Sequence, residues 1–375
     1  MRIACISGSQ VPASTAHSIQ MMKACQALAE LGHNVRVWLP GKETAGWSEL
    51  AKQYALTTPF EITYLRSPRL LRRYDFVLRA LHQAAAWKAD LVYTWIPQAA
   101  LLALWRSQPT VLELHDVPTG SLAPQVFQRI LRHPGRKRLL VITKGLVDKL
   151  TERFALDPNA PYLQIAPNGT DMVQYQNLLE PEAARQLLKL PPGLTAGYTG
   201  HFYAGRGTEL LVGLAQQNPH INFLWVGGHP KDVDAWREKL SSQSICNITL
   251  TGFVSQQELP LYQAACDILM MPYERVIAGS SGGNSADFCS PMKLFDYLAS
   301  GRSILSSDLP VLHEVLNEHN AVFCEPENLS AWQLGLWRLA SDESLRRKLG
   351  ARAAIDATQY TWRSRASRAL DGLVI

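Results

Sequence analysis

The segment with the clearest chemical potential covers residues 289–301 and reads Cys-Ser-Pro-Met-Lys-Leu-Phe-Asp-Tyr-Leu-Ala-Ser-Gly. Ser290 is a suitable helix N-cap and Pro291 a suitable first helical residue. The free backbone N–H groups of the first turn, with the helix dipole, would bind an anion such as a diphosphate. Lys293 would add positive charge, and Asp296, on the same helical face, could accept hydrogen bonds from ribose hydroxyls. A capped amphipathic helix with an exposed Lys–Asp pair is the alternative interpretation.

A second candidate anion site lies at residues 200–207, Gly-His-Phe-Tyr-Ala-Gly-Arg-Gly, after the strand-like residues 196–199. A glycine such as Gly200 lets a backbone approach a ligand closely, and Arg206 can bind phosphate through its planar fork of donors. The alternative is an ordinary strand-to-helix loop with a solvated arginine. The segment lacks GxGxxG and the Walker lysine pattern, which disfavours dinucleotide and P-loop sites.

Two features of the first half could also do chemistry. His115 and Asp116 follow the apolar residues 111–114, and a histidine there could hydrogen-bond a sugar hydroxyl. The small polar loop at residues 7–15 precedes a predicted helix and could hold a phosphate or an acceptor hydroxyl. A turn pair and a plain capping loop are the respective alternatives.

Strand-like and helix-like segments alternate along the chain, with turn-forming breaks at residues 167–170 and 191–193. The pattern predicts an α/β protein with two Rossmann-like, doubly wound parallel-sheet domains facing a cleft, at residues 1–170 and 190–355. Ligands of such sheets bind beyond the carboxyl ends of the strands. The predicted strands are 3–7, 35–39, 62–65, 91–95, 111–114, 139–142 and 163–166, then 196–199, 223–226, 248–250, 268–271, 304–306 and 322–324.

Composition limits the class of protein. The 375 residues are 47% hydrophobic and 18% charged, as in globular domains, and the net charge of +5 does not point to nucleic acid. Six cysteines without a CxxC pair indicate a reducing cytosol rather than zinc or disulfides. No secretory signal is recognised, and the longest uncharged stretch, residues 91–105, is shorter than the roughly 20 apolar residues of a spanning helix. We therefore expect a cytoplasmic protein, soluble or peripheral on the inner face of a membrane.

Basic residues form two groups in the first half, which could face an anionic membrane surface or simply be solvated. The groups are Arg66, Arg69, Arg72, Arg73 and Arg79, and then Arg129, Arg132, Arg136, Lys137 and Arg138.

Together these motifs resemble those of a GT-B fold, retaining glycosyltransferase of the family-4 type (glycosyl transferases group 1). The resemblance covers nearly the whole chain and is strongest at residues 290–308. Pro-Asn-Gly-Thr-Asp at 167–171 and Thr-Gly-Phe-Val at 251–254 support it. Two positions depart from the family pattern: Phe288 stands where a carboxylate is frequent, and the first loop lacks a paired glycine.

The resemblance implies donor-binding residues in the second half and sugar or acceptor contacts in the first. The implied set is Arg206, Lys293 and the backbone of Ser290, Pro291 and Met292 for the diphosphate, Gly200 beside them, Asp296 for the ribose, the backbone of Phe253 and Val254 for the base, His115 near the sugar, and Gly8 near the acceptor or phosphates. The resemblance also implies that the last helix, at 360–375, returns to the first domain.

The expected reaction moves a sugar from a UDP- or GDP-linked donor to an acceptor hydroxyl with retention, in polysaccharide, lipopolysaccharide or glycolipid synthesis. His115, Arg206 and Lys293 are the expected catalytic residues; the two cations would stabilise the leaving diphosphate. The acceptor could be a saccharide, a lipid-linked saccharide or a small molecule. No DxD-like pair occurs in a suitable loop, so we expect no essential metal and no other cofactor. The alternatives are a sugar-nucleotide 2-epimerase and a non-catalytic nucleotide-sugar-binding partner subunit.

Overall fold

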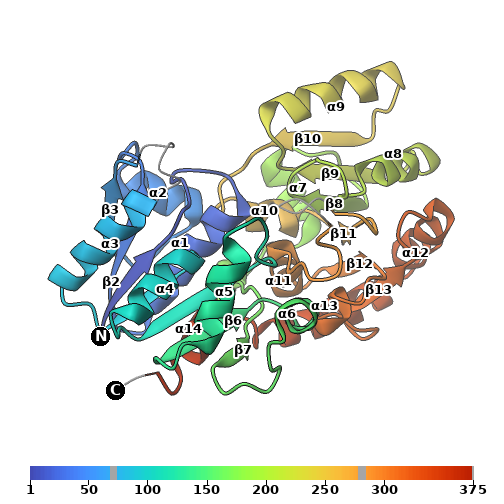
Figure 1. Ribbon diagram of the computed structural model, residues 1–375. Helices are drawn as coiled ribbons and strands as arrows, with labels where there is room; N and C mark the ends of the chain where they lie inside the picture. The colour runs from blue at the N-terminus through green and yellow to red at the C-terminus, as the bar shows by residue number, and fades with distance from the viewer. Residues whose placement is uncertain (68–73, 278–283, 374–375) are drawn as a thin grey trace. The chain divides into compact units, whose positions relative to one another are not determined.

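The computed structural model describes residues 1–67, 74–277 and 284–373. The chain forms two compact units, one of Met1–Asn168 with Trp362–Ile375 and one of Gly169–Thr361 (Figure 1). Each unit contains one parallel sheet flanked by helices. The predicted α/β class with two parallel sheets is therefore confirmed.

The first unit is built on a seven-stranded sheet with the order β3-β2-β1-β4-β5-β6-β7, and all neighbouring strands pair in parallel. The strands are β1 (Arg2–Ile6), β2 (Asn34–Pro40), β3 (Glu61–Leu65), β4 (Leu91–Thr94), β5 (Thr110–Leu114), β6 (Lys137–Val141) and β7 (Leu163–Ile165). The chain order reverses between β1 and β4, so the loops that follow these two strands diverge and leave room for a ligand.

The helices of the first unit are α1 (Ala16–Glu30), α2 (Trp47–Tyr54), α3 (Tyr74–Ala86), α4 (Pro97–Trp105), α5 (Ala123–Arg132), α6 (Lys144–Phe154) and α14 (Trp362–Leu370). The first begins after Thr15, whose hydroxyl accepts a hydrogen bond from the Ser18 N–H at 3.3 Å, and it ends just before Gly32, at φ +83°. The last helix of the chain packs against α1, and the Arg363 guanidinium donates to the Glu30 carbonyl at 3.3 Å.

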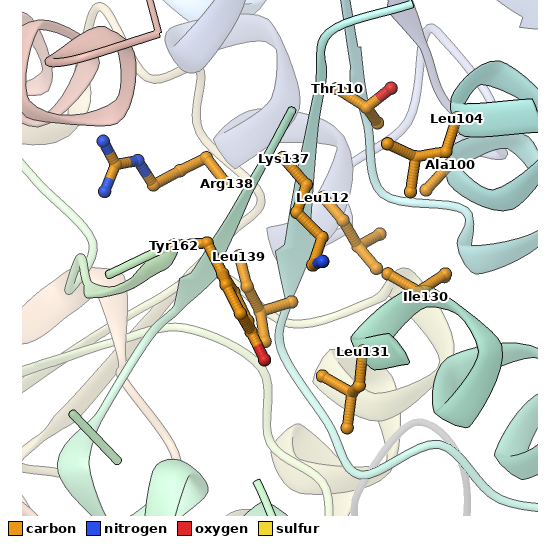
Figure 2. A pocket seen from close by; sticks show the side chains of 10 residues that line it. All are labelled: Ala100, Leu104, Thr110, Leu112, Ile130, Leu131, Lys137, Arg138, Leu139 and Tyr162. Atoms are coloured by element: carbon orange, nitrogen blue, oxygen red, sulfur yellow. The ribbon is translucent and has the colours of Figure 1, made fainter. Parts of the chain in front are cut away.

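A small pocket in this unit lies at the amino ends of β5 and β6 (Figure 2). Its lining is largely apolar, and the ammonium of Lys137 lies 4.4 Å from the ring centroid of Tyr162. Lys137 also donates to the His133 carbonyl, while Arg138 donates to the Pro161 and Asp371 carbonyls. These two cations of the second basic group are therefore engaged by the protein itself.

The second unit carries a six-stranded parallel sheet with the order β10-β9-β8-β11-β12-β13. Its strands are β8 (Thr195–Thr199), β9 (Asn222–Val226), β10 (Ile248–Gly252), β11 (Ile268–Met271), β12 (Ser303–Ser307) and β13 (Ala321–Cys324). The helices are α7 (Pro181–Leu188), α8 (Thr208–Gln217), α9 (Pro230–Ser242), α10 (Leu259–Ala264), α11 (Met292–Ser300), α12 (Leu329–Ser341) and α13 (Glu343–Ala357), with 3₁₀ turns η2 (Met172–Tyr175) and η3 (Leu312–Glu314). Here the chain order reverses between β8 and β11.

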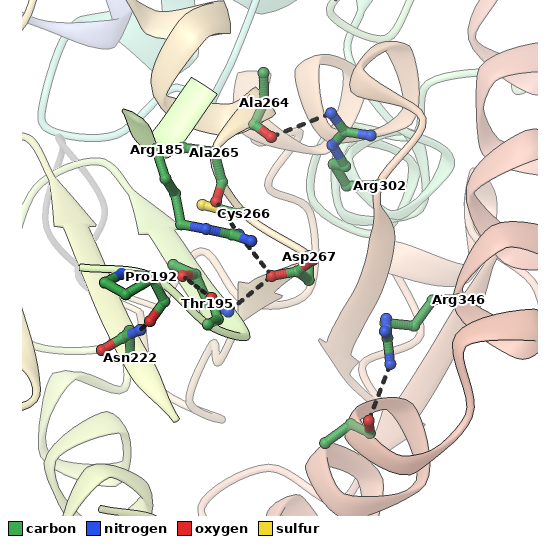
Figure 3. Close-up of polar contacts among 12 residues, drawn as sticks. Arg185, Pro192, Thr195, Asn222, Ala264, Ala265, Cys266, Asp267, Arg302 and Arg346 are labelled. Carbon is green, nitrogen blue, oxygen red and sulfur yellow. Dashed lines mark hydrogen bonds and ion pairs between the residues drawn. The ribbon is translucent and has the colours of Figure 1, made fainter. Parts of the chain in front are cut away.

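A buried ion pair closes the amino edge of this second sheet (Figure 3). Arg185 of α7 donates to the Asp267 carboxylate at 2.9 Å and to the Ala265 carbonyl at 3.0 Å. The same carboxylate accepts the Thr195 N–H at 2.8 Å, where β8 begins. The pair thus joins α7, β8 and the start of β11 at the edge opposite the carboxyl ends of the strands.

The predicted start of the helix near residue 290 is wrong by one residue. Pro291, at φ −68° and ψ 128°, is the N-cap, and α11 begins at Met292; Ser290 is not the cap. The extended ψ of Pro291 takes it out of the helical region, and its carbonyl accepts the first bond of the turn, from the Leu294 N–H at 3.1 Å.

Some sequence features fall on residues that the structure does not describe. Arg69, Arg72 and Arg73 of the first basic group lie outside the described residues. Within the described part of the chain, every helix is too short or too polar to cross a lipid bilayer.

Candidate functional site

Two predicted cations lie together in the second unit. Arg206 is in the loop after β8, and Lys293 is in the first turn of α11. The Lys293 ammonium lies 3.7 Å from the ring centroid of Tyr198 and 5.4 Å from that of Tyr273. The Arg206 guanidinium lies 5.0 Å from the same Tyr273 ring. Because Tyr273 follows β11, the cations gather where the loops after β8 and β11 diverge.

The ammonium of Lys293 is buried and has no hydrogen-bond acceptor among the described residues. Burial, and then the charge of Arg206, hold the pKa of Lys293 well below its usual value. Ring faces attract a cation but accept no conventional hydrogen bond. A buried, unpaired ammonium beside a guanidinium at a helix N-terminus is an arrangement that an anionic ligand would stabilise.

Two glycines let the backbone of this site lie close to neighbouring groups. Gly200 has φ +135°, and a Cβ there would lie 2.9 Å from the Lys293 Nζ. Gly207 has φ +68°, and a Cβ there would lie 1.9 Å from the Pro272 carbonyl oxygen. Backbone conformation favours glycine at both positions, and at Gly207 the Pro272 backbone also leaves no space for a side chain. At Gly200 a side chain would displace the end of Lys293.

Asp296, the predicted ribose ligand, already has partners within its own unit. Its Oδ1 accepts a hydrogen bond from the Thr170 hydroxyl at 2.9 Å. Tyr175 faces the same carboxylate, and burial, followed by the charges of Asp296 and Asp171, raises the pKa of its phenol well above the usual range. Asp296 therefore holds the segment around Thr170 and Tyr175, and its role toward a ribose stays a prediction.

Other predicted contacts of the second unit lie at strand ends. Phe253 directly follows β10 and is 46% exposed, and Val254 comes next. The Gly252 carbonyl accepts the Gly227 N–H at 2.8 Å, which joins the ends of β10 and β9. Phe288, where the sequence departs from the expected pattern, is buried.

In the first unit, His115 is held by a residue that the sequence analysis missed. His115 follows β5, and its Nε2 lies 2.6 Å from Oε1 of Glu113. Glu113 is fully buried and is paired with Arg365 of α14. The sequence contains a signal that could have identified Glu113: it is a carboxylate within the apolar strand Thr-Val-Leu-Glu-Leu, and a buried charge requires a partner.

Gly8 follows β1, the neighbour of β4 in the sheet. Beside Gly8, the buried Ser7 and Ser9 hydroxyls bond each other at 3.0 Å. The His17 ring meets the His115 ring edge-on, with centroids 5.7 Å apart. The loop after β1, the start of α1 and the end of β5 thus lie at the carboxyl edge of the sheet.

Comparison with known proteins defines the class. The Glycosyltransferase Family 4 model matches residues 19–174, and the Glycosyl transferases group 1 model matches residues 197–342. The two matches fall one on each half of the chain. The chain has the GT-B fold and belongs to the family-4, group 1 glycosyltransferases.

One curated relative is TuaH of Bacillus subtilis (strain 168), named as a teichuronic acid biosynthesis glycosyltransferase. The two are 31% identical over 126 residues, which is 34% of this chain and 30% of TuaH. The chain therefore matches less than a third of that relative's length.

Solved structures share the fold over the whole chain. Sucrose-phosphate synthase from Thermosynechococcus elongatus has a TM-score of 0.73 at 17% identity, covering 98% of this chain and 96% of that one. Anabaena HepE in complex with UDP-glucose has a TM-score of 0.73 at 15% identity, covering 100% and 99%.

Proposed function

We propose that this glycosyltransferase uses a nucleotide diphosphate-sugar as donor and transfers the sugar to an acceptor hydroxyl with retention of anomeric configuration. The observation that carries the proposal is the buried Lys293 ammonium beside Arg206 at the amino end of α11. A diphosphate supplies the acceptor that Lys293 lacks and a counter-charge for Arg206, which already donates to the Tyr203 hydroxyl at 2.6 Å. The UDP-glucose complex of HepE makes UDP the first nucleotide to test.

In this reaction the bond between the anomeric carbon and the phosphate oxygen breaks while the acceptor oxygen bonds to the same face of that carbon. Negative charge develops on the leaving diphosphate, and preorganised cations lower the barrier most where charge develops. Arg206 and Lys293 supply that charge, with the backbone of Ser290–Met292. The acceptor proton passes to the leaving phosphate oxygen, so the mechanism needs no separate base.

The remaining donor contacts follow from position. Asp296 would hold the ribose, the backbone of Phe253 and Val254 the base, and Gly200 would leave room for the phosphates. In the first unit, His115 would contact the transferred sugar, and Gly8 the acceptor or the phosphates. Arg206 and Lys293 would stabilise the leaving group without a required metal ion.

The acceptor is proposed to be a growing polysaccharide or a lipid-linked saccharide, at the cytoplasmic face of a membrane. The name of TuaH supports a role in cell-wall polysaccharide synthesis. Three exposed cations of the second basic group, Arg129, Arg132 and Arg136, remain available to an anionic surface.

The test uses Arg206→Ala and Lys293→Ala, with Arg237→Ala as the control. Arg237 is exposed, and its one ion pair within the described part of the chain is with Asp234, three residues away on α9. Each site variant should lower kcat by about 10²–10³, the usual effect of removing one group that stabilises transition-state charge. The control should retain full activity. Wild-type rates at saturating UDP-sugar for both site variants would refute the proposal.

Product analysis tests the remaining parts. NMR coupling of the anomeric proton in the product should show the configuration of the donor. Incubation of the UDP-sugar without acceptor should return it unchanged. An epimerised nucleotide sugar would instead identify a 2-epimerase.

A further inference from the structure

A buried polar cluster lies directly beneath His115 in the first unit. At its centre is the carboxylate of Glu113, which is completely buried in β5. Arg365 of α14 donates to both carboxylate oxygens, at 2.6 Å and 3.1 Å. The Tyr93 hydroxyl donates to Oε2, and the Gln20 amide donates to Oε1 at 2.5 Å. His115 completes the cluster through Nε2, 2.6 Å from Oε1.

Glu113 is ionised in this cluster. Burial alone would raise the pKa of its carboxyl, but the Arg365 charge and the His115 contact hold that pKa well below the usual value. An ionised carboxylate can only accept hydrogen bonds. The proton of the 2.6 Å contact therefore resides on Nε2 of His115, whatever the charge state of the ring.

Arg365 offsets the negative charge that Glu113 presents to its neighbours. Its guanidinium, 3% exposed, already balances the carboxylate charge in a two-pronged contact. At neutral pH the edge-on His17 ring, 5.7 Å away, adds no charge beside His115, because burial above all lowers the pKa of His17 to about 4. In the neutral ring with its proton on Nε2, the other nitrogen, Nδ1, is a hydrogen-bond acceptor.

We propose that Glu113, with its charge balanced by Arg365 from the last helix, is a positioning residue that holds His115 in the Nε2–H tautomer, so that Nδ1 accepts a hydrogen bond from a sugar hydroxyl. The identity of the hydroxyl rests on the proposed function; the tautomer does not. Nδ1 has no hydrogen-bond partner among the described residues, so it is available to a ligand.

The support of His115 combines two segments that are far apart in the sequence. Glu113 and His115 flank the end of β5, but Arg365 comes from 252 positions further along the chain. The Arg365 guanidinium also donates to the Pro167 carbonyl at 3.0 Å, which fixes its own position. Docking of α14 thus completes the support of a residue that belongs to the first half of the chain.

The direct test is the tautomer of His115, measured by ¹⁵N NMR of imidazole-labelled full-length protein. The His115 signals are assigned by their loss in His115→Gln. Within the pH range in which the wild type is folded, a neutral His115 ring should appear with a protonated Nε2 and an unprotonated Nδ1. An Nδ1–H form, or an imidazolium throughout that range, would overturn the proposal.

The variant test compares Glu113→Gln with Tyr93→Phe. Both remove a hydrogen bond of the same cluster, but only the first changes the partner of His115 Nε2. Glu113→Gln should give a mixture of tautomers and lower kcat roughly tenfold, the worth of one hydrogen bond, with UDP affinity unchanged. Tyr93→Phe should keep the wild-type tautomer. An unchanged tautomer in Glu113→Gln would overturn the proposal.

Glu113→Gln leaves Arg365 buried without its counter-charge, which by itself strongly destabilises the fold. The double variant Glu113→Gln, Arg365→Met removes both charges. In the same NMR measurement it should give a mixture of tautomers, and an unchanged tautomer would overturn the proposal. Because the measurement needs no substrate, it separates this inference from the proposed function. If no UDP-sugar is used but the tautomer is as stated, only the function fails; if transfer occurs with the other tautomer, only the inference fails.

Discussion

The unpaired ammonium of Lys293 predicts that UDP binding takes up a proton. In the free protein, burial and Arg206 lower the pKa of Lys293 well below its usual value. A bound diphosphate would oppose that shift, because its negative charge stabilises the ammonium form of Lys293. At any pH above the pKa that Lys293 has in the free protein, Lys293 must therefore gain a proton when UDP binds.

The size of the effect follows from linkage. Each pH unit above the pKa of free Lys293 should weaken UDP binding tenfold, or about 1.4 kcal/mol, up to the pKa of the complex. The neighbouring groups do not titrate in this range: burial raises the pKa of Tyr198 and of Tyr273, so both phenols stay neutral, and an arginine such as Arg206 stays charged. The terminal phosphate of UDP, with a pKa of about 6, is ionised above pH 7.

Stability should change in the opposite direction. A lysine whose pKa is lowered on folding binds its proton more readily in the unfolded state. The free energy of unfolding of the free protein should therefore rise with pH between the lowered pKa and the ordinary lysine value of about 10.4. Thus higher pH should stabilise the free protein while it weakens the complex.

Calorimetry of UDP binding between pH 7 and pH 9, in pairs of buffers with different ionisation enthalpies, measures both the affinity and the proton uptake. Lys293→Met is the matched control, because it retains Arg206 and the tyrosines; it should bind UDP weakly and without the uptake. UDP affinity that is constant with pH in the wild type, with no proton taken up, would show that Lys293 is already charged in the free protein and would refute the reasoning.

Three further predictions concern the second unit. Gly200→Ala should lower the free energy of unfolding by about 1–3 kcal/mol. It should also weaken UDP binding, because its Cβ would lie 2.9 Å from Lys293 Nζ. The control is Gly32→Ala, at φ +83° and with no atom within 4 Å of its Cβ, which should lower stability alone. Thr170→Val removes the donor of the 2.9 Å hydrogen bond, whereas Asp296→Asn keeps an oxygen acceptor for it. Melting curves should therefore show the larger loss for Thr170→Val, but only Asp296→Asn should raise the KM for a UDP-sugar. Equal KM values would limit Asp296 to a structural role. Asp267→Ala should cost about 3–5 kcal/mol by leaving Arg185 unpaired, and because the pair lies at the amino ends of the strands, UDP affinity of the folded variant should be unchanged.

Local pattern was enough to predict the architecture. Short apolar segments separated by helical periodicity predict parallel strands that are buried on both faces, and the structure has them in two sheets. Ser290 and Pro291 predicted a helix start within one residue, because capping depends on neighbouring backbone groups. Arg206 and Lys293 were recognised because each stands in a loop or first turn directly after predicted elements.

The partners of those residues depended on contacts between distant segments. Tyr273, whose ring lies between 5.0 Å and 5.4 Å from both cations, is one of many tyrosines in the sequence and has no local pattern to mark it. The Thr170 contact of Asp296 joins residues 126 positions apart. The Glu113–Arg365 pair spans 252 positions, and only the packing of the last helix brings its guanidinium to the carboxylate. Hydrophobic periodicity is a property of neighbours in the chain, whereas the choice of partner for a buried charge is made when the separate elements pack.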